Sequence, residues 1–152
     1  MTPRRSGSGG NRLSRSLKGW LYGVSFAVLL SGVLWLLFEW KVRVAGEFGE
    51  ERHPLEAWWL KLHGAAAMGF LVMFGTLLRG HVAGGWRRGL RRLSGGSMTA
   101  LSGVLILTGY GLYYVGSETL RPWISKVHWA VGLLAAGLLV FHRRGVSFPP
   151  DS

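Results

Sequence analysis

The chain has 152 residues, which is enough for one compact unit and leaves no room for a separate catalytic domain. Its net charge is +11, but the basic residues flank long apolar runs instead of forming a stripe on a soluble face, which argues against nucleic acid as a partner. Because cysteine is absent, the sequence excludes disulfides, iron–sulfur clusters, thiolate haem ligation and covalently attached c-type haem.

Residues 1–17 are rich in Ser, Gly and Arg and are expected to form a disordered basic tail. The first long apolar run, about 20–40, is predicted to be a retained membrane anchor, because it is too long for a signal peptide and lacks a small-residue cleavage site. A polar loop within 41–56 follows, and it contains both glutamates and basic residues. The second apolar run, about 57–82, opens with two tryptophans that are typical of a membrane interface.

An arginine-rich loop without acidic residues, within 83–96, leads to the third apolar run, about 98–115. The fourth run, about 122–142, starts at Pro122, a residue favoured in the first turn of a helix. Each run is expected to be helical, because an open strand cannot satisfy its backbone hydrogen bonds in lipid. The sequence therefore predicts an all-α fold, a four-transmembrane-helix bundle spanning 18–145, with a disordered tail at 146–152.

The distribution of arginine predicts how this bundle is oriented. The N-terminus, the 83–96 loop and the C-terminus are the strongly positive parts of the chain. Since positive segments stay on the cytoplasmic side, both termini are expected in the cytoplasm of a bacterial inner membrane that the chain crosses several times. The loops within 41–56 and 116–121, which contain the glutamates, are then expected on the outer side.

Four of the five histidines lie near the ends of the second and fourth apolar runs. These two runs cross the membrane in the same direction, so His63 should lie level with His128 at the outer face, and His81 level with His142 at the inner face. An ideal helix turns by about 100° per residue, which puts His63 and His81 on one face and leaves His128 and His142 about 40° apart. Two histidines that face each other are the ligand set of a bis-imidazole haem, so the pattern predicts two non-covalent b-type haems.

The two separations do not match, because they correspond to rises of about 27 Å in the second run and about 21 Å in the fourth. A helix tilt or oblique haem planes must absorb the difference. The alternative interpretation makes each histidine an interfacial residue bonded to carbonyls or lipid headgroups, and it is strongest for His81 and His142, which lie beside arginines. The fifth histidine, His53, precedes Pro54 and is expected to be a solvated loop residue.

Other residues could contact a cofactor held by these histidines. Gly132 is a candidate for close approach to a flat macrocycle, as are Ala67 and Ala135 on the same stripes, although ordinary helix packing explains a single small residue equally well. Positively charged side chains near the ligands would bind the haem propionates. The candidates are Arg52 and Arg121 on the outer side and Arg143 and Arg144 on the inner side.

Three further cations, Lys61, Arg79 and Lys126, each lie two residues before a predicted ligand. Two residues correspond to about 200° of helical rotation, so these side chains should face away from the haem. They are expected to extend to the lipid headgroups instead.

The segments LHGAAAMGFLVMFGTLLRGHV, LTGYGLYY and VHWAVGLLAAGLLVFH, with the arginine loop between the first two, resemble small bacterial di-haem b-type membrane cytochromes. The likeness is broad and includes the cytochrome b561 and flavinylation-associated cytochrome groups. The 14-residue spacing of His128 and His142 is also similar to that within a helix of the respiratory cytochrome b. The resemblance implies haem ligation by His63, His81, His128 and His142.

The resemblance also implies electron transfer between a quinol or periplasmic redox protein and the other membrane face, alone or as the anchor subunit of a larger complex. Whether the chain is an enzyme is left open, and a subunit is favoured over a self-contained enzyme. The first alternative is a non-redox membrane scaffold or assembly factor with interfacial histidines. A transporter is the weakest alternative, because the helix cores have no acidic residues and no paired broken helices.

Overall fold

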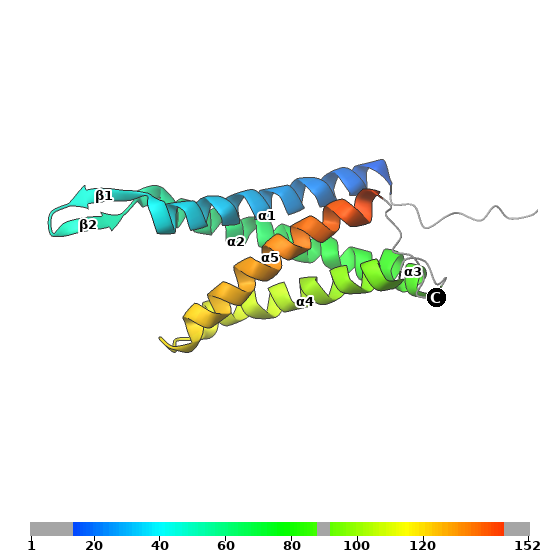
Figure 1. Cartoon of the computed structure of the whole chain (residues 1–152). Coiled ribbons are helices and arrows are strands. Elements are labelled where there is room, and N and C mark those ends of the chain that lie inside the picture. The colour runs from blue at the N-terminus through cyan, green and yellow to red at the C-terminus, as the bar shows by residue number, and fades with distance from the viewer. Residues whose placement is uncertain (1–13, 88–91, 145–152) are drawn as a thin grey trace, which may run out of the picture.

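The computed structural model describes residues 14–87 and 92–144, with the backbone alone for residues 92 and 142–144. Most of these residues are helical. The four long helices are α1 (Arg15–Lys41), α2 (Pro54–Leu77), α4 (Arg92–Tyr114) and α5 (Leu120–Arg144), and α2 continues directly into a π-helical segment, η1 (Leu78–Val82), and a short helix, α3 (Ala83–Arg87). In Figure 1, α1 lies along α2 and α4 lies along α5, so the fold consists of two helical hairpins.

The helix ends differ from the predicted ones by a few residues. Helix α1 begins at Arg15 because Ser14 caps it, accepting a hydrogen bond from the backbone amide of Leu17 at 3.2 Å. Residues 15–17, expected in the disordered tail, are therefore helical, while 1–13 and 146–152 lie outside the described residues. The predicted 83–96 loop is shorter than expected, since its residues 83–87 and 92–96 are helical.

The segment predicted as a polar loop, 41–56, contains a two-stranded antiparallel sheet. Strand β1 (Arg43–Gly46) pairs with β2 (Gly49–Arg52), and Gly49 adopts a φ of 127°, a conformation that favours glycine. The expectation of an all-α fold is wrong at this point. The antiparallel packing of α1 and α2 brings the segment that follows α1 next to the segment that precedes α2. Their backbones pair, although this charged sequence lacks the alternation of apolar and polar residues that is typical of a strand.

Large apolar side chains cover the outside of the molecule. Leu77, with 9% of its surface exposed, is the only buried hydrophobic residue among those described. Three helical stretches in the described part are long and apolar enough to cross a membrane: Arg15–Lys41, Pro54–Arg87 and Leu120–Phe141. The structure thus supports a multi-pass membrane protein. The third predicted span, about 98–115, corresponds to α4, which is not among these three stretches; it has 23 residues, and Gly, Ser, Thr and Tyr lower its hydropathy.

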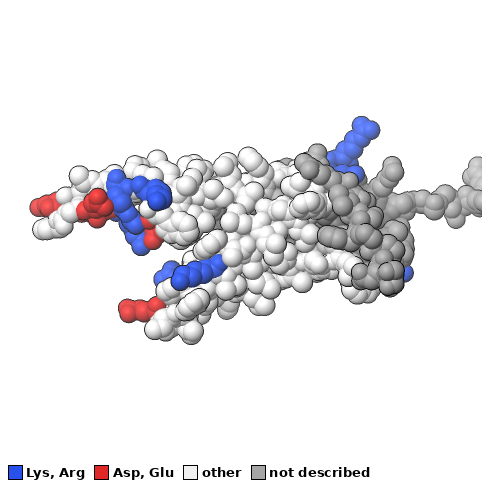
Figure 2. Space-filling model, viewed as in Figure 1, with Lys and Arg blue, Asp and Glu red and all other residues white. Residues whose placement is uncertain are grey.

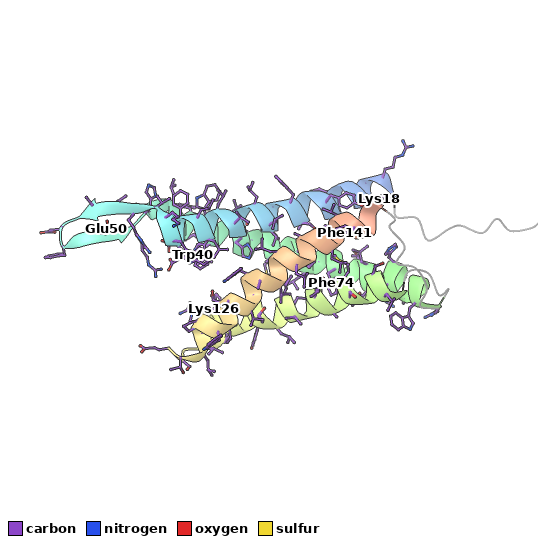
Figure 3. The ribbon with its side chains drawn as sticks, in the orientation of Figure 1. Lys18, Trp40, Glu50, Phe74, Lys126 and Phe141 are labelled. Atoms are coloured by element: carbon purple, nitrogen blue, oxygen red, sulfur yellow. The ribbon has the colours of Figure 1, made fainter. Side chains whose placement is uncertain are left out.

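Charged side chains are concentrated at the two ends of the bundle, and a broad uncharged band separates them (Figure 2). The acidic residues among those described lie at one end, which we call the hairpin end because β1 and β2 extend from it. Figure 3 places Lys18 and Phe141 at the opposite end, and Trp40 and Lys126 nearer the hairpin end. Consequently α2 and α5 run in the same direction.

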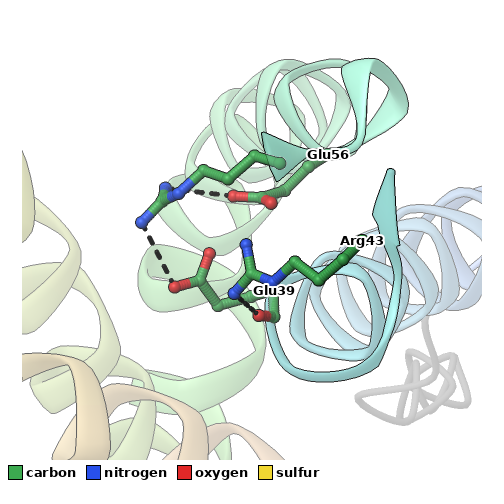
Figure 4. A network of polar contacts seen from close by, with 4 residues as sticks. Glu39, Arg43 and Glu56 are labelled. Carbon is green, nitrogen blue, oxygen red and sulfur yellow. Dashed lines mark hydrogen bonds and ion pairs between the residues drawn. The ribbon is translucent and has the colours of Figure 1, made fainter. Parts of the chain in front are cut away.

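A network of ion pairs joins α1, β2 and α2 at the hairpin end (Figure 4). The guanidinium of Arg52 lies 3.3 Å from Glu39 Oε1 and 3.1 Å from Glu56 Oε1, and Arg43 donates a hydrogen bond to the main-chain carbonyl of Glu39. Glu56 is buried, with 4% of its surface exposed. Arg52, considered above as a propionate partner, is therefore already bonded to two carboxylates, and these neutralise its charge.

Replacing Arg52 with alanine is expected to destabilise the protein by about 1–2 kcal/mol, because the buried Glu56 carboxylate loses its cation. The value is below that of a fully buried pair because the Arg52 side chain is 67% exposed. Thermal unfolding in detergent would measure the loss. The double variant Arg52→Ala/Glu56→Gln should recover most of it, and an equal loss in both variants would show that the ion pair is not the cause.

Candidate metal-ligand site between two helices

His63 on α2 and His128 on α5 lie next to each other near the hairpin end. Their ring centroids are 6.1 Å apart and their planes are inclined at 83°. Both residues are half-buried. The structure therefore brings together the two histidines that the sequence pairs at one membrane face.

The Nδ1 atom of His63 lies 3.0 Å from the main-chain carbonyl oxygen of Val28 and 3.3 Å from Ser31 Oγ, both on α1. A carbonyl oxygen can only accept a hydrogen bond, so Nδ1 must carry the proton. The Ser31 hydroxyl donates to the carbonyl of Ala27, one turn earlier, at 2.6 Å. Its oxygen is therefore free to accept from the same Nδ1–H.

His128 has a similar partner on α4. Its Nδ1 lies 2.8 Å from Thr108 Oγ1, and that hydroxyl lies 2.7 Å from the carbonyl oxygen of Val104. A hydroxyl has one proton, and Thr108 donates it to the Val104 carbonyl, which can only accept. Thr108 Oγ1 therefore accepts a hydrogen bond from Nδ1–H of His128.

This pattern fixes the tautomer of both rings. A neutral imidazole protonated at Nδ1 has a lone pair on Nε2, the atom that binds metals. Over the described residues, neither Nε2 makes a hydrogen bond, since the contacts of both rings involve Nδ1. Both rings therefore have an Nε2 lone pair that makes no hydrogen bond to the described residues.

The spacing of the rings suits one shared metal ion. If the two Nε2 atoms point at a metal from opposite sides at about 2 Å each, the ring centroids are about 6 Å apart, which is close to the observed 6.1 Å. The inclined planes do not oppose this, because an imidazole can rotate about its metal–nitrogen bond without breaking it.

A glycine follows each of the two hydroxyl residues. A Cβ atom on Gly32 would lie 3.1 Å from His63 Cε1, and one on Gly109 would lie 3.4 Å from His128 Cε1. The hydroxyl residue thus bonds Nδ1 while the glycine next to it lets the imidazole approach the helix.

The sequence analysis did not identify Ser31, Gly32 and Thr108 as partners of the histidines. The missing signal is an internal repeat. The pattern S-x5-[ST]-G occurs at 25–32 and at 102–109, and W-x2-K-x-H occurs at 58–63 and at 123–128. The structure shows that α1 and α2 correspond to α4 and α5, because in each hairpin the hydroxyl residue of the first pattern contacts the histidine of the second.

The lysines of the repeated pattern occupy equivalent places. The ammonium of Lys61 lies 4.6 Å from the ring centre of Trp58, and that of Lys126 lies 4.6 Å from the ring centre of Trp123. Both lysines are exposed, which agrees with the expectation that they do not face the ligand pair.

The two glycines provide a matched test of this packing. Alanine at Gly32 is expected to displace the His63 ring by a few tenths of an ångström, because the 3.1 Å approach is too short for a methyl group. Alanine at Gly109 would make an almost ordinary contact. Gly32→Ala should therefore weaken metal or haem binding more than Gly109→Ala, as measured by titration of the purified protein. The reverse order would contradict the described ring positions.

The remaining predicted site residues are placed as follows. Arg121 is exposed on α5, seven residues and about two turns before His128, so it lies on the ligand face toward the hairpin end. Gly132 faces Leu105 on α4, and a Cβ atom on Gly132 would make an ordinary van der Waals contact with that side chain at 3.8 Å. Arg143 belongs to α5, but its side chain lies outside the described residues.

His53 is not a solvated loop residue as expected. It caps the N-terminus of α2, since its Nδ1 accepts a hydrogen bond from the amide of Leu55 at 3.1 Å. Its ring also packs edge-on against Phe38, with centroids 5.2 Å apart. Pro54 occupies the first turn, where its missing N–H costs nothing, so the His-Pro pair starts the helix instead of preventing it.

The second predicted pair is only partly described. His81 lies half-buried on η1, and His142 lies on α5 with its side chain outside the described residues. The estimate of about 100° per residue does not hold through η1, because π-helical turns contain more residues than α-helical turns. The predicted common face of His63 and His81 therefore cannot be derived from an ideal helix.

Within the described residues, no group of three or more His, Cys, Asp or Glu side chains could hold a metal ion. The His63–His128 pair offers two ligands only. In comparisons with protein family models, curated proteins and solved structures, no match to the chain was found.

Proposed function

We propose that the protein is a membrane electron-transfer cytochrome that holds haem b between α2 and α5, with His63 and His128 as axial ligands. The observation that carries the proposal is the pair of imidazoles 6.1 Å apart, each with Nδ1 hydrogen-bonded to a neighbouring helix and Nε2 left for a metal. Two ligands suffice for haem iron, because the macrocycle supplies the other nitrogens. A bare divalent ion normally recruits carboxylates or additional ligands.

The packing of the helices is a second observation in favour of the proposal. Helix α1 packs closely on α2, and α4 packs closely on α5, whereas α2 and α5 have little backbone contact over the described residues. Ala67 and Ala135, on the predicted ligand stripes, are half-buried small residues, whereas Gly132 faces Leu105 on α4. Small side chains at such positions would let a flat cofactor approach the helix backbone.

Iron with two imidazole ligands has no open coordination position, so such a haem would transfer electrons and would not bind oxygen. With the positive-inside orientation, the hairpin end faces the outside of a bacterial inner membrane and both termini lie in the cytoplasm. His81 and His142 would ligate a second haem b near the inner face. Electrons would then cross the membrane between a quinol or redox protein and the other side, and Arg121 and Arg143 would pair with propionates.

The experiment is to purify the protein from haem-replete cells and to record a reduced-minus-oxidised spectrum with a haem count per chain. The spectrum of a six-coordinate b-type cytochrome and two haems per chain are expected. A colourless preparation would refute the proposal and would favour the non-redox membrane scaffold, in which the bond from His63 to the Val28 carbonyl simply joins α1 to α2.

A further inference from the structure

We infer that Ser31 and Thr108 are positioning residues that hold the two imidazoles in their ligand tautomer, and that Thr108 has the larger influence on the iron. This inference rests on the proposed function. Neither hydroxyl would touch the cofactor, since each would act through the Nδ1–H of a ligand. Such hydrogen bonds orient a ligating histidine and increase its basicity.

The difference between the two sides follows from the alternatives available to each Nδ1–H. His128 has one acceptor, Thr108 Oγ1 at 2.8 Å, which in turn donates to the Val104 carbonyl. A hydroxyl that donates one hydrogen bond is a better acceptor for another, because the two bonds polarise each other. Among the described residues, nothing else bonds this nitrogen, so removal of the hydroxyl would leave Nδ1–H without a partner.

His63 is less dependent on its hydroxyl partner. Its Nδ1 lies closer to the Val28 carbonyl, at 3.0 Å, than to Ser31 Oγ, at 3.3 Å. The carbonyl belongs to the backbone and remains after any substitution of Ser31. The ring therefore keeps its tautomer when the serine hydroxyl is removed.

The direction of the effect follows from charge. A hydrogen bond from Nδ1–H gives the imidazole partial imidazolate character, which stabilises ferric iron more than ferrous iron. Loss of the bond at His128 is therefore expected to weaken ferric binding and to raise the midpoint potential. Loss of the Ser31 hydroxyl should change both quantities much less.

The test compares Thr108→Val, Thr108→Ser and Ser31→Ala with the wild type. Thr108→Val replaces the hydroxyl by a methyl group of similar size, while Thr108→Ser keeps the acceptor. Haem b is titrated into the apo-protein in detergent, and midpoint potentials are measured by redox titration. Thr108→Val should bind ferric haem about tenfold more weakly. If ferrous binding is unchanged, the potential rises by about 59 mV.

Thr108→Ser is expected to behave as the wild type, and Ser31→Ala should lose less than about threefold in affinity. Equal potentials in Thr108→Val and the wild type would overturn the inference, as would a larger effect of Ser31→Ala than of Thr108→Val. If the wild type itself bound no haem, the proposed function would fail instead, so the two failures are distinguishable.

A measurement on the wild type covers the case in which Thr108→Val does not fold. Both ligand rings of the ferric protein should show an Nδ1 proton by NMR that exchanges slowly with D2O, because each is bonded to a neighbouring helix. Absence of either proton would contradict the assigned tautomer.

Discussion

Replacing His63 or His128 with alanine is expected to remove one haem from each chain. With one axial ligand lost, the iron would no longer be held between α2 and α5, and the remaining imidazole alone binds it weakly. The pyridine haemochrome assay, normalised to protein concentration, should fall from about two haems per chain to about one. Both variants should give the same result, because the two histidines serve one iron.

His53→Ala is the matched control for this experiment. It removes a histidine from the same end of the molecule, but one that caps α2 and packs on Phe38. This variant should lose about 1 kcal/mol of stability, measured by thermal unfolding, and should keep its full haem content. A haem content that stays at the wild-type level in His63→Ala and His128→Ala would contradict the ligand assignment.

Replacing His81 with alanine is expected to leave one haem per chain, with the spectrum and potential of the site at the hairpin end. The reason is that His81, on η1 directly before α3, and His142, next to Phe141 on α5, belong to the end opposite the hairpin end. The double variant His63→Ala/His81→Ala should bind no haem. A wild type with a single haem that His81→Ala does not affect would restrict the proposal to the hairpin-end site.

The long helices were predictable because hydropathy and tryptophan position record where a helix meets the membrane interface. The hairpin at 43–52 was not, since its strands pair because two helix ends meet and not because of their own periodicity. The π-helical segment η1 was also missed. An extra residue in a helical turn is accommodated by packing, and hydrophobic spacing does not reveal it.

The candidate site was predictable to a similar degree. Equal depth on parallel helices is enough to pair His63 with His128, but the partners of Nδ1 depend on which face of α1 and α4 covers each ring. The repeated patterns of α1 with α4 and of α2 with α5 contained this information, because residues at equivalent positions of the two hairpins make the same kind of contact. The role of Arg52 was not predictable in this way. It was a candidate partner for a haem propionate, but in the structure it forms ion pairs with Glu39 and Glu56.

The division of the fold into two helical hairpins has a consequence for assembly. In the proposal above, each hairpin contributes one histidine to each haem, and at the hairpin end each histidine is hydrogen-bonded within its own hairpin, so neither hairpin would supply both ligands of an iron. Under the proposed ligation, the free energy of haem binding is also the free energy that docks one hairpin on the other. Docking of the two hairpins and binding of haem would then be linked, and the haem concentration would set the fraction of chains in which the two hairpins are docked.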